Sequence, residues 1–259
     1  MVAWGATAII TRTLEIGHLG AYSTWETHGL TTVSQKVTAA EYGGPQVRLL
    51  VGPTGVLHIQ GDLWVVDHHQ FQTQPIDQNV VVLPGGRLEV DGGFSLYATA
   101  QLSGGGTVVT PNLRVYGGTV APGMSPGHLT IDGNLSFSGG QLVIELGGLA
   151  PGTEHDLLEV LGTLTLDQWG HGTALVLKAV DGFVPQAGQG FDFLRATQVD
   201  GSFTSLVDET GLGLTLADLQ FSGGHIGINL AAAVPEPHAA LLLLLGLIAL
   251  RLRHRRAAR

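Results

Sequence analysis

The chain contains no cysteine, few aromatic residues and few basic residues outside its last nine positions. The absence of cysteine excludes disulfide bonds, thiolate zinc sites and a cysteine nucleophile. Phe, Trp and Tyr make up only 6% of the sequence, so any core must be largely aliphatic. Lys36 and Lys178 are the only lysines, and residues 1–237 carry seven basic against 21 acidic side chains, a net charge of −14. A surface of that sign repels phosphate backbones, and we therefore expect no nucleic-acid partner.

Two sequence motifs of common catalytic sites are also missing. There is no Gly-Lys-Ser/Thr phosphate loop and no His-Glu-x-x-His. The densest acidic group is Glu154, Asp156 and Glu159. A polysaccharide hydrolase or lyase would need carboxylates or Ca²⁺ ligands aligned in one groove, with Lys or Arg nearby. No such constellation emerges, so we predict no enzyme activity, no catalytic residue and no cofactor.

Metal-ligand residue types cluster at one point, Asp67, His68 and His69. Adjacent side chains on an extended chain point apart, so they rarely bind one ion together. We therefore predict a solvated loop over Asp67–Gln78 and no metal site. Five further histidines are scattered singly, and we expect surface or turn positions for them: His58, His128, His155, His171 and His225.

Glycine, in contrast, is abundant, with 39 residues, about twice the usual share of ~7%. The clearest example is Gly117–Gly148, in which short alternating apolar runs are each closed by glycine. Alternate side chains of a strand share one face. We therefore expect one buried face formed by Leu129, Ile131, Leu135, Phe137, Leu142, Ile144 and Leu146.

The pattern x-Leu-x-[Val/Ile]-x-Gly recurs along the chain. It occurs at Leu57/Ile59/Gly61, Leu88/Val90/Gly92, Leu113/Val115/Gly117, Leu129/Ile131/Gly133 and Leu158/Val160/Gly162. A recurring strand-plus-glycine unit is typical of a solenoid, in which each coil buries its face against its neighbours. Antiparallel hairpins in a β-sandwich would give similar alternation, and the glycine spacing favours the solenoid. We predict an all-β fold, a parallel β-helix or β-solenoid with a C-terminal β cap and one short C-terminal hydrophobic helix.

Changes in sequence character divide the chain into four segments. Residues 1–46 are expected to form irregular N-terminal strands, and residues 47–170 the glycine-rich β-solenoid. Residues 171–230 contain longer strands with wider loops and are expected to form a cap over the open end of the stack. Residues 231–259 form a tail of different physical character.

This tail has three parts: a motif at 234–237, a wholly apolar run at 239–250 and an arginine-rich end at 251–259. Twelve apolar residues span ~18 Å as a helix, against a hydrocarbon core of ~30 Å, and snorkelling arginines extend that reach. The run has no polar face, which disfavours an interfacial helix. The positive-inside rule places the arginines in the cytoplasm and residues 1–237 on the opposite side of the membrane. The residues concerned are Val234, Pro235, Glu236 and Pro237 in the motif, Ala239, Leu241, Leu245 and Leu250 in the helix, and Arg251, Arg253, Arg255 and Arg256 in the basic cluster.

The three features in this order resemble the PEP-CTERM sorting signal of Gram-negative bacteria. The resemblance implies an exported protein whose tail is processed by an exosortase-type enzyme, with membrane contact through the tail before release or surface display. Gly117–Gly148 is also similar to the glycine-rich autotransporter-like (passenger-associated) repeats that often accompany this tail. Such proteins begin with a secretory signal, whereas Met1–Ile10 has no basic region and no apolar stretch. We therefore expect the true start to lie upstream.

Together these features predict an exported, surface-associated or extracellular-matrix protein of structural or adhesin-like role, with extracellular polysaccharide as a candidate partner. The alternative is a carbohydrate-binding or carbohydrate-active β-helix protein. Exposed aromatic side chains would support that alternative, and Trp64 and Trp169 are the residues that test it.

Overall fold

The computed structural model describes residues 2–3, 7–11, 14–16, 23–39, 46–65, 77–124 and 126–230. Regular structure in these residues is β-strand, apart from one 3-10 turn at Leu216–Asp218. The prediction of an all-β chain is confirmed. None of the described residues forms a helix that is both long and apolar enough to cross a membrane.

Several predicted features lie outside the described residues. They are the Asp67, His68 and His69 cluster, the apolar helix at 239–250 and the rest of the 231–259 tail. The predicted loop Asp67–Gln78 was too long at its end, because strand β10 already begins at Asp77.

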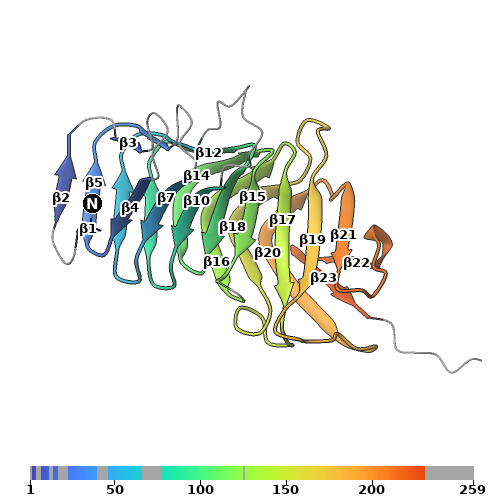
Figure 1. The fold of residues 1–259 in the computed structure, drawn as a ribbon. Coiled ribbons are helices and arrows are strands. Elements are labelled where there is room, and N and C mark those ends of the chain that lie inside the picture. Colours follow the sequence, from blue (N-terminus) through green and yellow to red (C-terminus); the bar gives the residue numbers. More distant parts are fainter. Residues whose placement is uncertain are drawn as a thin grey trace, which may run out of the picture.

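The first of two sheets runs the length of the described chain (Figure 1). In the described residues it has nine strands, neighbours in this order: β1 (Val2–Ala3), β4 (Ser23–Thr27), β7 (Gln46–Val51), β10 (Asp77–Val82), β13 (Ala100–Gly104), β15 (Thr119–Pro122), β17 (Gln141–Leu146), β19 (Ala174–Ala179) and β21 (Ser205–Glu209). We call this sheet the first side.

The second sheet contains two rows of strands. Its main row is β2 (Ala8–Ile10), β5 (Leu30–Val33), β8 (Val56–Ile59), β11 (Arg87–Val90), β14 (Thr107–Tyr116), β16 (His128–Phe137), β18 (Leu157–Thr165), β20 (Gly190–Asp200), β23 (His225–Asn229) and β22 (Leu219–Ser222). A further row pairs in the order β3 (Leu14–Ile16), β6 (Val37–Ala39), β9 (Leu63–Val65) and β12 (Gly93–Tyr97), and then joins the second half of β14. The third side is the further row together with the second halves of β14, β16, β18 and β20. We call the rest of the main row the second side.

The chain alternates between the two sheets, and up to β21 the described strands pair in parallel with their counterparts in the neighbouring turns. Figure 1 shows the resulting order, with the colours running along the stack from blue to red. On the first side this pairing aligns Leu49, Val80, Leu102, Val120 and Leu142 in one column. Antiparallel hairpins of a sandwich would not produce such columns.

The inward columns form the core. The seven residues that we expected to share a buried face, from Leu129 to Leu146, all have no exposed surface. The repeat pattern fills a matching column on the second side, where Leu57 pairs with Leu88 and Ile59 pairs with Val90. Because each apolar side chain stacks on a similar one in the next turn, burial is continuous along the stack.

Glycines occupy the corner between the second and third sides. Gly133 has φ +146°, and a Cβ there would overlap the carbonyl oxygen of Thr110 in the preceding turn. A Cβ on Gly162 would come within 2.6 Å of the Gly133 oxygen, and one on Gly92 within 2.8 Å of the Gly61 oxygen. The closing glycines of the repeat therefore allow successive turns to approach closely at this corner.

Strand pairing does not change at the segment boundaries expected from the sequence. The described strands before residue 47 belong to the same parallel ladders, as the pairing of β2 with β5 shows. Parallel pairing also continues beyond residue 171, where β21 pairs with β19. Among the described strands, antiparallel pairing is confined to β22 and β23, a hairpin on β20 whose turn is Gly223–Gly224. The pairing therefore changes at the terminal hairpin and not at residue 171.

Substitution of Gly133 by Ala tests the close approach at the corner. We expect the free energy of unfolding to fall by about 3 kcal/mol or more, because backbone strain and steric overlap combine. Gly170→Ala is the matched control, because Gly170 has φ +73° but no atom within 4 Å of an added Cβ. It should cost about 1 kcal/mol. Equal losses in urea denaturation of the two variants would contradict the proposed packing.

Candidate functional site

The acidic residues Glu154, Asp156 and Glu159 do not form one site. Glu154 Oε2 accepts hydrogen bonds from the backbone N–H groups of Leu149 and Ala150, at 2.9 and 3.0 Å. These bonds hold the pKa of Glu154 below its usual value. Glu159 lies one strand from His128 and pairs with it at 3.1 Å. The first carboxylate therefore shapes a loop, and the last belongs to a surface ion pair.

Asp156 is buried, with 1% of its surface exposed. Its Oδ1 accepts a hydrogen bond from the Gly127 N–H at 2.8 Å, and its Oδ2 accepts one from the Glu145 N–H at 2.9 Å. Burial raises the pKa of Asp156 to about 7, against the lowering effect of these two bonds, and the Glu145 carboxylate raises it further. Asp156 thus links the backbone of β17 to that of Gly127, and the pKa of its carboxyl is raised.

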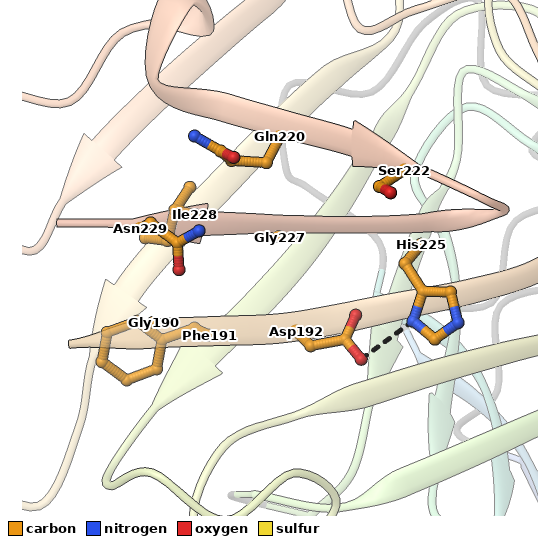
Figure 2. A pocket seen from close by; sticks show the side chains of 9 residues that line it. All are labelled: Gly190, Phe191, Asp192, Gln220, Ser222, His225, Gly227, Ile228 and Asn229. Atoms are coloured by element: carbon orange, nitrogen blue, oxygen red, sulfur yellow. Dashed lines mark hydrogen bonds and ion pairs between the residues drawn. The ribbon is translucent and has the colours of Figure 1, made fainter.

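A shallow groove lies on the outer face of the C-terminal hairpin and β20 (Figure 2). Gly227 forms its floor, flanked in register by Gln220 on one side and by Asp192 on the other. The groove is lined by Gly190, Phe191, Asp192, Gln220, Ser222, His225, Gly227, Ile228 and Asn229. Its polar side chains come from three neighbouring strands.

Asp192 organises the charged end of this groove. Its Oδ2 accepts hydrogen bonds from Nε of Arg195 at 2.9 Å and from Nδ1 of His225 at 3.0 Å. The Oδ1 atom is buried and has no hydrogen-bond partner among the described residues. Figure 2 shows the His225 ring turned toward this carboxylate.

The groove contains an aspartate, a histidine and a serine, but not in the geometry of a catalytic triad. Ser222 lies opposite His225 in the antiparallel register. A nucleophile must be hydrogen-bonded to the base that activates it. Within the described chain, Ser222 and His225 share no such bond. The groove offers hydrogen-bonding groups and a polarised imidazole, without an activated hydroxyl.

The other histidines lie apart from one another. His58 pairs with Asp91 at 3.0 Å on the surface, and His171 is exposed on a loop. His155 is buried, with Nδ1 3.1 Å from the Gly148 carbonyl oxygen and Nε2 3.3 Å from that of Asp192. Among the described residues, no three His, Asp or Glu side chains are placed to hold a metal ion. The Asp67, His68 and His69 cluster and the tail residues Val234–Pro237 lie outside that part of the chain.

Both tryptophans named from the sequence are exposed, Trp64 at 38% and Trp169 at 58%. Lys36 Nζ lies 3.4 Å above the centre of the Trp64 ring. Trp169 stacks on Tyr116, with ring centres 5.8 Å apart, and Tyr116 stacks on Tyr97 at 5.1 Å. This aromatic row was not predicted from the sequence. Its signal was a tyrosine directly after an inward aliphatic residue in two successive turns, as in FSLY and LRVY.

Trp169 reaches the row from a neighbouring loop. Tyr97 and Tyr116 are register partners on adjacent strands, and the register of β16 puts Ser138 next in the column. This small side chain leaves space above Tyr116. The Gln168 N–H donates a hydrogen bond to the Phe137 carbonyl at 2.9 Å, which brings the Trp169 loop over that space.

Comparison with known proteins adds no functional information: no family model, no curated protein and no solved structure matches this chain.

Titration of Asp156 predicts a pH dependence of stability. Its folded pKa of about 7 lies above the ordinary 3.8, so its favourable contribution is full below the lower value and is lost as pH rises through the upper one. Relative to Asp156→Asn, the wild-type free energy of unfolding should fall by about 4 kcal/mol between pH 4 and pH 8.

Urea denaturation across that range measures the difference. Asp132→Asn is the control, because Asp132 is an exposed carboxylate and its loss should leave the fall unchanged. The assignment is wrong if the Asp156 variant keeps the same pH dependence as the wild-type protein.

Proposed function

We propose that this chain is an exported, surface-associated or extracellular-matrix structural protein. Its body is a β-solenoid closed at its C-terminal end by an antiparallel hairpin. Its tail is a PEP-CTERM-type sorting signal that contacts the membrane and is processed by an exosortase-type enzyme. In this role the body is a stiff spacer, and the tail directs the protein to its destination.

One observation carries the structural role: parallel register continues from β1 to β21 through the described turns. Each turn contacts mainly its neighbours, so length is added without a change of packing. Outward positions hold polar side chains and surface ion pairs, including Arg87 with Glu89 and Lys178 with Glu209. Such a body suits an exposed, soluble spacer, because its apolar columns are covered along their length.

The position of the tail is compatible with removal. The last described strand, β23, ends at Asn229, and Leu230 donates a final hydrogen bond to the Gln189 carbonyl. Cleavage at or beyond the motif Val234–Pro237 would therefore leave every described strand in place. This position in the sequence supports a tail that acts as a signal.

A carbohydrate-binding role is the second candidate. The exposure of Trp64 and Trp169 favours it, since a sugar platform requires an accessible aromatic face. Binding is the form of this alternative that the two exposed tryptophans support.

Processing of the tail tests the main proposal. We expect the protein, produced from its own locus in its native host, to occur outside the cytosol and to lack the 251–259 arginines. A variant with Ala at Pro235, Glu236 and Pro237 should keep them and remain in the inner membrane. Cell fractionation and mass spectrometry of the C-terminal peptide measure both results. Wild-type protein in the cytosol with an intact tail would contradict the proposal.

A further inference from the structure

The outward surface of the third side differs in chemistry from that of the second side. On the second side, histidines pair with neighbouring carboxylates, as in His58 with Asp91 and His128 with Glu159. On the third side the strands present hydroxyl groups, aromatic rings, one guanidinium and one carboxylate between buried aliphatic residues. These outward positions include Trp64, Tyr97, Arg114, Tyr116, Ser136, Thr165 and Asp200, whereas Ser95 in the same column is buried.

Two cationic groups stand on this side of a strongly acidic body. Arg114 forms no ion pair within the described residues, and it lies two strands from Trp64, with Ser95 as the register partner between them. Two strand spacings correspond to about 9.5 Å. Lys36 lies over the Trp64 ring and has no carboxylate partner in the described chain. The side therefore presents two positive charges, spaced along the stack, that form no ion pair with a described acid, and the Asp62 carboxylate lies near the Arg114 guanidinium beside Gly93.

The Trp169 ring supplies an accessible apolar face. One of its faces stacks on Tyr116, yet the residue exposes 58% of its surface. A ring with one face covered can reach that exposure only if its other face is open. The phenol groups of Tyr97 and Tyr116 lie beside it as hydrogen-bonding groups.

We infer that the third side binds a carboxylate-bearing polysaccharide. The open face of Trp169 stacks on the C–H face of a sugar ring. The Arg114 guanidinium pairs with a carboxylate through two parallel hydrogen bonds, and Lys36 meets a second carboxylate from beside Trp64. Serine and tyrosine hydroxyls bond the sugar hydroxyls. The charge of −14 over residues 1–237 repels any polyanion, so the two local cations and the aromatic face must outweigh that repulsion. This inference rests on the carbohydrate-binding candidate, whose site and ligand class it specifies, and does not depend on the tail.

Calorimetric titration of the full chain, in mild detergent at low salt, tests the site with polygalacturonate and with neutral dextran as probes. We expect the acidic polymer to bind about tenfold more tightly than dextran, with an affinity that falls as salt is added. Arg114→Gln should weaken polygalacturonate binding by about tenfold. Trp169→Ala should weaken it by a similar factor, whereas Trp169→Phe, which keeps an aromatic face, should retain most of it.

Two controls separate this site from general charge and exposed aromatic surface. Arg87→Gln removes a cation from the second side, and Phe221→Ala removes an aromatic ring that is 47% exposed on the terminal hairpin. Both should change affinity by less than about twofold, and circular dichroism should show the wild-type fold in every variant used.

The inference is overturned if polygalacturonate does not bind, if dextran binds equally well, or if the Arg114 and Trp169 variants bind like the wild-type protein. It is also overturned if Arg87→Gln weakens binding as much as Arg114→Gln does. Export and tail processing are measured separately in cells, so failure of this binding assay leaves that proposal standing.

Discussion

Register between successive turns is the constraint on which this structure depends. A single turn has too little apolar surface to bury its inward side chains, so each turn must cover those of its neighbours. Residues of similar size must then recur at the same point of every turn. Leu135 pairs with Leu113 on one side and with Leu164 on the other, and all three are fully buried. A slip of one residue would turn each apolar column toward solvent.

The corner glycines follow from the same constraint. Turns that stack at the spacing of paired strands, about 4.8 Å, bring their corner backbones into contact. Gly133 and Gly162 allow this backbone contact because they have no side chain. Elsewhere the link is made by a polar group, as where Asp156 accepts hydrogen bonds from the backbone of Gly127 and Glu145. With the inward face committed to packing, any binding role must fall to outward side chains, which the core leaves free to vary.

Local features of this fold were predictable from the sequence, and non-local ones were not. Alternation over Gly117–Gly148 correctly predicted strands and their buried residues, because side-chain direction depends only on the neighbouring backbone. The alternation could not decide between parallel and antiparallel partners. Variation in the length of the turns also obscured the repeat. The register partners Leu102 and Val120 are separated by 18 positions, whereas Leu142 and Leu175 are separated by 33.

The candidate sites show the same division. The sequence singled out Trp64 and Trp169 as residues whose exposure would matter. It could not reveal that Trp169 stacks on Tyr116, because these two residues are 53 positions apart. The groove around Asp192 likewise depends on the hairpin of β22 and β23 returning to β20. The nearness of Glu154, Asp156 and Glu159 in the sequence was misleading, because the chain turns one of them inward and the other two to separate partners.

The parallel register can be tested directly because the chain has no cysteine of its own. Thr107 and Thr130 are outward register partners on β14 and β16, and paired strands lie within the Cα separation of about 4.4–6.8 Å that a disulfide requires. A Thr107→Cys/Thr130→Cys double variant should therefore form an intramolecular disulfide in high yield under mild oxidation. A Thr107→Cys/Ser136→Cys variant, close to the pairing that an antiparallel hairpin would give, should remain reduced. The reverse result would contradict the parallel stack and the account of the core that rests on it.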